Sequence, residues 1–324
     1  MTVIKGEPNV ETVRELARQF SNWGRWGADD QIGTLNLAGP EEVRAAAASI
    51  RSGKRISLAF PFDTAGPQTQ GFGRFNPLHL MIRDGGDIAT GSVVRDFYGG
   101  RDRHIRGTDD IVIMPLQAGT QWDALGHIFF DGKMYNGHGP EDVSSFGARV
   151  NDIAQARDSI AGRGVLLDVA RTKGVAALQP GYAITDTDLD EAVAAANVTI
   201  RRGDFVLVRT GQLGERRGAW GDYAGGAAPG LGLESVSWIA EHEIAGLATD
   251  TWGMEVLPNQ TSDVFQPLHI ILLVHMGLYI GEMFDLEELG EDCAADGQYD
   301  FFFAAPPLPF TGAVGSPVNP LAIK

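Results

Sequence analysis

The sequence predicts an α/β protein whose strands form mixed sheets. Some segments place apolar residues at helical spacing, whereas others are short apolar runs typical of strands. The two kinds of segment alternate without a regular βαβ rhythm, so we do not expect a purely parallel sheet. A chain of 324 residues can bury a large core. We therefore expect one domain over residues 1–324, with residues 1–54 as a helical extension.

The N-terminal part is expected to contain two helices. Apolar residues recur at helical spacing from Val10 to Phe20, which predicts the first helix. The second begins at Pro40, because proline suits the first helical position, and it stops near Gly53. Residues 55–60 alternate polar and apolar side chains, so they predict a strand.

The rest of the chain predicts short strands and three longer helices. The further strands are apolar runs over residues 78–82, 110–116, 164–169, 205–209, 244–249 and 278–280. The helices are expected from a cap at Thr185 or Asp186 to residue 196, over 233–243 and over 266–276. The C-terminal tail is proline-rich, and no element is predicted for it.

Two loops carry aromatic residues. Residues 64–77 are rich in glycine and proline and include Phe72 and Phe75. Residues 218–232 hold six glycines together with Trp220 and Tyr223. The glycine-rich segment is either a disordered surface loop or a lid whose aromatic rings cover a substrate.

The composition of the chain disfavours several classes of protein. The formal net charge of -16 opposes binding to nucleic acid or to an anionic membrane surface. The single cysteine, Cys293, excludes an intramolecular disulfide framework, and we expect it to be a packed core residue. The most apolar run, residues 268–280, is too short and too polar to span a bilayer. Residues 1–8 lack an apolar signal-peptide core, so we expect a cytoplasmic protein.

Two segments concentrate the polar side chains that could perform chemistry. In residues 117–127, Gln121 and Asp123 would point to one face of an extended strand, with His127 nearby. Oxygen donors and an imidazole could hold a divalent cation or act on a carbonyl, although a buried polar network would use the same residues. In residues 267–282, His269 lies on an apolar helix face. Glu282 follows an apolar strand, so it must be buried with a partner or bind something.

Residues 117–127 resemble the signature His-x-Gly-Thr-His-x-Asp-x-Pro-x-His of the cyclase family of metal-dependent hydrolases. That family includes bacterial kynurenine formamidase and isatin hydrolase. The residues that match the signature are Gly119, Thr120, Asp123 and His127, and those that depart from it are Gln117, Gln121 and Leu125. The later segment resembles the family's second block, with His269 and Glu282 in its metal-binding positions. Residues 26–36, 203–211 and 248–251 are similar to further family segments, so the resemblance covers most of the chain.

The resemblance implies a swivelling β/β/α fold and a homo-oligomer, a dimer or a tetramer. It also implies hydrolysis of an amide or lactone bond of a small cyclic or aromatic substrate, by water that Zn²⁺ or Mn²⁺ activates. The expected metal ligands are Gln117, Gln121, Asp123, His269 and Glu282, and His127 would shuttle protons. Glutamine binds a metal through a neutral amide oxygen. This ligand set is therefore expected to favour Mn²⁺ or Mg²⁺, whereas Zn²⁺ favours sites rich in imidazole. In a metal-free variant, the glutamines would instead donate hydrogen bonds to a substrate carbonyl.

The substrate pocket is expected to be aromatic. Its candidate residues are Phe72, Trp122, His138, Trp220 and Tyr223. Trp122 could equally belong to the core, and His138 could equally be a solvated loop residue. The rival functions are a polyketide-type cyclase, a kynurenine formamidase, and a binding protein that kept the fold without the chemistry. The sequence contains neither a Gly-x-Ser-x-Gly motif nor a phosphate-binding loop, which disfavours serine hydrolases and nucleotide binding.

Overall fold

A computed structural model describes residues 6–69 and 71–324. Residues 1–5 of the N-terminal segment, and Gln70 of the first aromatic loop, lie outside the described residues. Within the described part, nine strands form one mixed sheet, in the order β1-β15-β13-β7-β9-β11-β12-β4-β14. Their bounds are β1 (Arg55–Ser57), β4 (Gln121–Asp123), β7 (Ala161–Asp168), β9 (Phe205–Arg209), β11 (Gly246–Thr249), β12 (Tyr279–Glu282), β13 (Asp300–Ala304), β14 (Gly315–Pro317) and β15 (Leu321–Ile323).

Other strands form separate two-stranded ribbons. They are β2 (Leu78–Arg83) with β3 (Asp109–Ile113), β5 (Val143–Ser144) with β6 (Gly147–Ala148), and β8 (Ala183–Ile184) with β10 (Gly230–Leu231). The α-helices are α1 (Val10–Gln19), α2 (Pro40–Ala47), α3 (Gly85–Thr90), α4 (Val169–Thr172), α5 (Asp186–Ala196), α6 (Gln212–Arg216), α7 (Ser235–Glu241), α8 (Pro267–His269) and α9 (Glu287–Asp296). Shorter helical turns are η1 (Gly33–Leu37), η2 (Gly71–Gly73), η3 (Val93–Phe97), η4 (Tyr135–Gly137), η5 (Pro140–Asp142), η6 (Ile153–Ala156) and η7 (Ile270–Met276).

The centre of the large sheet is parallel. Strands β7, β9, β11 and β12 run in one direction, and the strands on either side of them pair antiparallel. All five residues of β9 are buried, as expected for a strand covered on both faces. Helices α2 and α5 pack against β7. The structure thus confirms the predicted α/β class with a mixed sheet.

The N-terminal helices follow the predicted pattern. Asn9 caps α1, and the buried face of α1 packs against η7. Helix α2 begins at Pro40 as predicted, but it ends at Ala47, well before Gly53. The predicted helix over residues 266–276 is present as α8 continued by η7, which has π-type hydrogen bonding.

The C-terminal tail is more regular than its prolines suggested. It supplies β14 and β15, whereas β13 ends just before the first proline of the tail, Pro306. Strand β14 ends at Pro317 and lies at the edge of the large sheet. Proline is tolerated there because an edge strand leaves backbone positions without a ladder partner. No element had been predicted here, since composition alone does not show which prolines occupy such positions.

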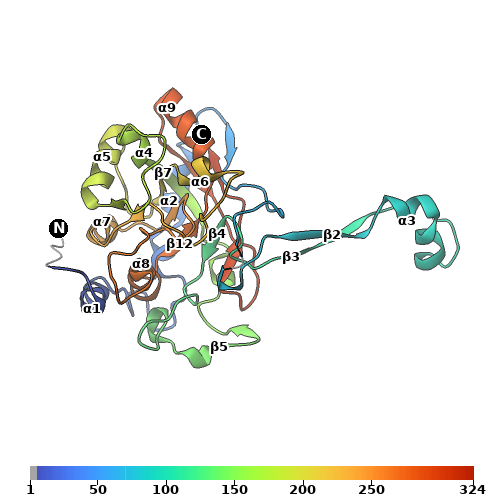
Figure 1. The fold of residues 1–324 in the computed structure, drawn as a ribbon, viewed down its shortest axis with the longest axis horizontal. Helices are drawn as coiled ribbons and strands as arrows, with labels where there is room; N and C mark the ends of the chain where they lie inside the picture. The colour runs from blue at the N-terminus through green and yellow to red at the C-terminus, as the bar shows by residue number, and fades with distance from the viewer. Residues whose placement is uncertain (1–5, 70) are drawn as a thin grey trace.

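An extended arm leaves the body of the molecule. Strands β2 and β3 pair as a ribbon that carries α3 and η3 at its far end, and Figure 1 shows this segment projecting away from the sheet. We call residues 78–113 the arm. One face of its ribbon is apolar, because Leu78 pairs with Ile113 and Leu80 pairs with Ile111. These four side chains are 44% to 55% exposed.

The glycine-rich segment 218–232 packs onto the body. Tyr223 is buried, and its hydroxyl donates to the backbone oxygen of Asp250 at 2.9 Å. The Trp220 indole donates to the backbone oxygen of Ala65, and its ring packs against Phe60. The segment is therefore a packed part of the body, and neither ring is free to close over a substrate as a lid would. In the described residues, no helix is both long and apolar enough to cross a bilayer.

Candidate metal centre

Two adjacent strands place the polar side chains of the site on one face of the sheet. In the antiparallel pairing of β4 with β12, Gln121 lies opposite Glu282. Asp123 follows two residues after Gln121, so it points to the same face. The Thr120 hydroxyl donates to the backbone oxygen of Met283 at 2.7 Å, which fixes the start of β4 against the end of β12. Glu282 is the last residue of its strand, whereas the sequence had placed it just beyond.

Helix α8 brings His269 over these strands. Its Nε2 lies 3.1 Å from Glu282 Oε1 and 4.0 Å from Asp123 Oδ2. One ligand atom from each of Asp123, His269 and Glu282 lies within 4.8 Å of the others. All three side chains are at least 98% buried. With Gln121, whose side-chain amide lies 2.8 Å from Glu282 Oε2, the structure brings together four of the five residues that the sequence singled out as metal ligands.

Glu255 holds the histidine in place. Its carboxylate accepts hydrogen bonds from the backbone N–H groups of Leu268 and His269, at 3.1 and 3.0 Å. It also lies 2.7 Å from Nδ1 of His269. A carboxylate at a helix N-terminus is favoured by the helix dipole as well as by these bonds. Sequence reasoning missed Glu255, because it precedes the helix by a long loop and no local spacing links it to His269.

Burial and mutual repulsion set the protonation of the site. Burial raises the pKa of Glu282 above its ordinary value, and the neighbouring Asp123 raises it further. Burial by itself would lower the pKa of His269. Hydrogen bonds to Glu255 and Glu282 outweigh burial and raise that pKa to about 10. Without a bound cation, these contacts favour the protonated form of the His269 imidazole.

A small aromatic cavity opens onto this group. It is lined by Phe72, Arg74, Asp123, His127, Trp252, Phe265, Gln266, His269 and Glu282. The space for water-sized groups is about 40 Å³, more than the 10–15 Å³ or so that one water needs. Phe72 packs against both Trp252 and Phe265, with ring centroids 5.8 and 6.0 Å apart. Of the predicted pocket residues, Phe72 thus lines the cavity.

His127 lies beside the carboxylates without a close hydrogen bond to them. Its Nε2 is 3.9 Å from Asp123 Oδ1. Burial lowers the pKa of His127 below 6.5, although the Asp123 charge acts in the opposite direction. The imidazole is therefore neutral near pH 7 and able to accept a proton.

Gln117 lies next to the site but does not line the cavity. Its side-chain nitrogen would be 2.5 Å from a Cβ added at Gly315. Gly315 pairs with Asp123 across β14 and β4, so this amide lies on the same face of the sheet as the Asp123 carboxylate. The absence of a side chain at Gly315 makes room for it.

The other predicted pocket residues lie away from the cavity. Trp122 alternates to the opposite face of β4, where its indole donates to the backbone oxygen of Ala305 at 3.0 Å. His138 approaches Asp142, with 3.6 Å between Nδ1 and Oδ2. Trp220 and Tyr223 belong to the apolar cluster that also contains Trp252, but only Trp252 lines the cavity. Instead, Trp252 and Phe265 form the aromatic wall, and no periodic pattern in the sequence marked either of them.

The residues present fit a divalent cation. Asp123 and Glu282 are two buried carboxylates, and burial without a compensating charge is costly. The side-chain oxygen of Gln121 is buried and has no hydrogen-bond partner among the described residues. Its amide nitrogen donates to Glu282 Oε2 at 2.8 Å, which keeps the amide at the site. Carboxylate and amide oxygens with one imidazole are a donor set for a hard or borderline cation.

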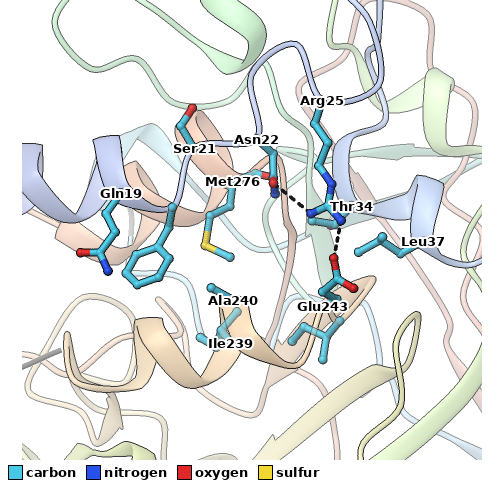
Figure 2. A pocket seen from close by; sticks show the side chains of 12 residues that line it. Gln19, Ser21, Asn22, Arg25, Thr34, Leu37, Ile239, Ala240, Glu243 and Met276 are labelled. Carbon is cyan, nitrogen blue, oxygen red and sulfur yellow. Dashed lines mark hydrogen bonds and ion pairs between the residues drawn. The ribbon is translucent and has the colours of Figure 1, made fainter. Parts of the chain in front are cut away.

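A larger pocket elsewhere on the molecule has no comparable chemistry. It lies between the end of α1 and α7, with a volume of about 190 Å³. Figure 2 shows Arg25 directed toward Glu243 across this pocket, and the two side chains form an ion pair. Arg25 also donates to Asn22 at 3.1 Å. The charged side chains of this larger pocket thus pair with each other, whereas the smaller cavity exposes carboxylates and an imidazole.

Comparison with known proteins agrees with this geometry. A family model described as a putative cyclase matches residues 56–256. The crystal structure of a novel cyclase is 39% identical, with a TM-score of 0.85 over 95% of this chain and 99% of that one. No curated protein matches the chain.

More distant structures share the fold. Isatin hydrolase A from Ralstonia solanacearum is 20% identical, with a TM-score of 0.61 over 86% of this chain and 93% of its own. A predicted metal-dependent hydrolase from Bacillus stearothermophilus is 19% identical, with a TM-score of 0.50 over 83% of this chain and 97% of its own. The signature-like segment on β4, the sheet around it and the match across more than half of the sequence together confirm the resemblance: the chain belongs to the cyclase family.

Proposed function

We propose that the protein is a metal-dependent hydrolase that opens an amide or lactone bond of a small cyclic or aromatic substrate. The observation that carries this proposal is the buried group of Asp123, His269 and Glu282 at the base of an aromatic cavity. Structural neighbours named as isatin hydrolase and as metal-dependent hydrolase support the reaction class.

Four side chains would hold the cation. Asp123 and Glu282 would contribute carboxylate oxygens, His269 its Nε2, and Gln121 its unpartnered side-chain oxygen. A divalent cation there would polarise a carbonyl and make bound water more acidic. Glu255 would keep Nδ1 of His269 protonated and the ring oriented, as carboxylates commonly do for metal-bound histidines.

His127 would move the proton. It lines the cavity beside Asp123 and is neutral near pH 7. It would accept a proton from the attacking water and then donate it to the leaving nitrogen or oxygen when the carbonyl bond breaks. Proton transfer of this kind typically contributes about 10²–10⁴-fold to the rate.

The aromatic rings would select the substrate. Phe72, Trp252 and Phe265 offer flat apolar surfaces beside the carboxylates. A planar ring packed against them would be held with its carbonyl toward the polar base, and water would be displaced from the mouth of the cavity. This arrangement favours cyclic or aryl amides and lactones over extended peptides.

We infer Mn²⁺ as the preferred ion, because two carboxylates and an amide oxygen accompany a single imidazole. The test is metal analysis of the purified protein, followed by activity on a panel of aryl lactones and cyclic amides after loading with Mn²⁺ or Zn²⁺. Asp123→Ala should lose both metal and activity while the protein still folds. As a matched control, Asp158→Ala removes an aspartate that is 85% exposed and should change neither.

Two outcomes would contradict the proposal. Full activity in Asp123→Ala would refute the site assignment. A protein that contains no stoichiometric metal and whose activity ignores chelators would favour the metal-free variant. If it also lacks activity on the whole panel, the binding protein becomes the better interpretation.

A further inference from the structure

The cavity contains one cation that the proposed reaction does not use. Arg74 lines the cavity together with Asp123, His127 and Glu282. Its guanidinium carbon lies 5.3 Å from the centroid of the Trp252 ring, in a cation–π contact. Among the residues that the structure describes, no carboxylate forms an ion pair with this guanidinium.

Other half-buried or buried arginines in this chain are paired. Arg163 donates to Asp204 and Asp300, and Arg209 contacts Asp168 and Glu287. These pairs satisfy the planar fork of donors that an arginine presents. Arg74 is instead held by the face of an aromatic ring, which positions its charge and leaves its N–H donors available.

We propose that Arg74 is the anion-binding residue of the cavity, and that the molecule bound there is an aromatic carboxylate. The inference rests on the proposed function and names the chemistry of its ligand. Phe72, Trp252 and Phe265 supply the surface for a ring. The guanidinium matches a carboxylate in shape as well as charge, since two parallel N–H groups can donate to its two oxygens.

The carboxylate has two chemical sources. The substrate can carry it beside the bond that is cleaved. Alternatively, the reaction forms it: the water oxygen adds to the carbonyl carbon, the C–O or C–N bond breaks, and the departing atom takes a proton. The new acid then loses a proton and becomes the carboxylate. Both sources present the same group to Arg74, and binding measurements can distinguish them.

The experiment measures binding of benzoate, phthalate and benzamide to the full-length, manganese-loaded protein by calorimetry. The cation also attracts carboxylates, so the informative quantity is the ratio of each affinity between wild type and Arg74→Met. Methionine keeps an apolar stem on Trp252 and removes the charge. Loss of one hydrogen-bonded ion pair predicts weaker benzoate or phthalate binding by about 10- to 100-fold. Benzamide, which has the same shape without the charge, should change by less than about twofold.

Two further variants separate charge from packing. Arg74→Lys keeps the charge but not the fork, so it should restore part of the lost affinity. Phe72→Leu removes ring contact and should weaken benzoate and benzamide by similar factors. A loss that Arg74→Lys does not restore at all, together with weaker benzamide binding in Arg74→Met, would show a packing role and overturn the inference.

The probes also identify the source of the carboxylate. Weaker binding of both benzoate and phthalate in Arg74→Met supports the carboxylate formed by the reaction. Weaker binding of phthalate alone supports a second carboxylate carried by the substrate. Unchanged affinity for both acids in a metal-loaded protein overturns the inference and leaves the hydrolase proposal intact. The hydrolase proposal is contradicted by a different result, namely that the wild-type protein binds no metal.

Discussion

At the scale of single residues, the site differs from the family signature mainly in its glutamines. Gln121 stands in a signature histidine position, faces Glu282 across the strands, and keeps a buried oxygen without a partner. An amide oxygen is a neutral, hard donor, whereas imidazole is the donor that zinc favours. This exchange of donor type should shift the choice of metal without changing the positions of the carboxylates.

Restoring the histidines tests the role of the glutamines. Gln121→His should raise zinc affinity relative to manganese, by about 10-fold or more, because an imidazole replaces an amide oxygen beside Asp123 and Glu282. The Gln117→His change alone should have a smaller effect, since that side chain lies over Gly315, beside the cavity. Competitive metal titration of both single variants and the double variant provides the measurement. Unchanged zinc affinity in the double variant would mean that neither side chain reaches the metal.

His127 provides the test of proton transfer. In His127→Ala, metal content should stay near normal, because the grouped donors Asp123, His269 and Glu282 remain and His127 is not among them. The maximal rate should fall by about 10²–10⁴-fold. Metal analysis and steady-state kinetics on the same preparation give both numbers. Metal lost in proportion to activity would identify His127 as a ligand instead.

At the scale of elements, the site depends on how α8 docks against β12. The helix contributes one proposed ligand, His269, and its start is held by Glu255 through two backbone N–H groups and Nδ1. Such an outer carboxylate fixes both the tautomer and the direction of the ring. The strand pair β4–β12 supplies the remaining donors. The centre is therefore assembled where a helix N-terminus meets the carboxyl end of a parallel strand, a common ligand position in α/β sheets.

The Glu255→Gln variant measures how much the contacts between Glu255 and α8 contribute to metal affinity. Glutamine keeps the size and one acceptor oxygen but loses the charge that orients His269. Metal affinity should fall by about 10- to 100-fold while the fold persists. Glu234→Gln is a suitable control, because its carboxylate bonds to Gln260 away from the cavity. Equal metal affinity in wild type and Glu255→Gln, measured by titration, would remove Glu255 from the site.

Helix η7 also carries a pH-sensitive contact with the N-terminal part of the chain. His275 stacks on Trp23, with ring centroids 5.1 Å apart, and its buried Nε2 has no hydrogen-bond partner among the described residues. Burial lowers its pKa below 6.5, while Asp131 acts in the opposite direction. Arg14 and Lys133 line the same pocket, and Arg14 forms an ion pair with Asp131.

The direction of the pH effect follows from that lowered pKa. As pH falls through about 6.5, His275 in the unfolded chain binds a proton more readily than in the folded chain. The free energy of unfolding should therefore fall between pH 7.5 and 5.5. His275→Phe keeps an aromatic ring on Trp23 and should show a smaller fall, measured by urea unfolding at both pH values. An equal fall in both proteins would show that other groups cause it.

At the scale of the whole molecule, the arm is the part that needs packing partners most. A two-stranded ribbon is marginal by itself, and this one exposes an apolar face formed by Leu78, Leu80, Ile111 and Ile113. Residues 95–106 at its far end include four arginines and two aspartates, whereas the chain carries a net charge of -16. A second copy of this acidic chain would therefore attract the arm end, so we propose that the arm packs against another copy in a dimer or tetramer.

A double substitution that places opposite charges on the ribbon tests whether the arm mediates oligomer formation. Leu80→Lys combined with Ile111→Glu replaces an apolar cross-strand pair by an ion pair, which supports the ribbon itself but removes its apolar face. Light scattering after size exclusion should show an oligomer for wild type and for Asp158→Ala, but a smaller particle for the double variant. A wild-type protein that is monomeric at micromolar concentration, or an unchanged mass in the variant, would contradict the proposal.

The sequence by itself determined the elements with strong local patterns. The continuous apolar run of β9 and the spaced apolar residues of α1 predicted those elements at or within one residue of their bounds. The motif around β4 also showed which short segment would carry Asp123 and His127. In each of these cases, the determining interactions lie within a few residues, so their spacing is visible in the chain.

Only the tertiary structure decided which distant residues complete the site. Glu255, Arg74, Trp252 and Phe265 lie in loops, and no periodicity distinguishes them from surface residues. They become site residues because β4, β12 and α8 meet where the loops before the arm and after β11 converge. Likewise, β14 is a strand only because β4 offers it an edge. Contacts between segments hundreds of residues apart depend on packing of the whole core, and local sequence does not encode that arrangement.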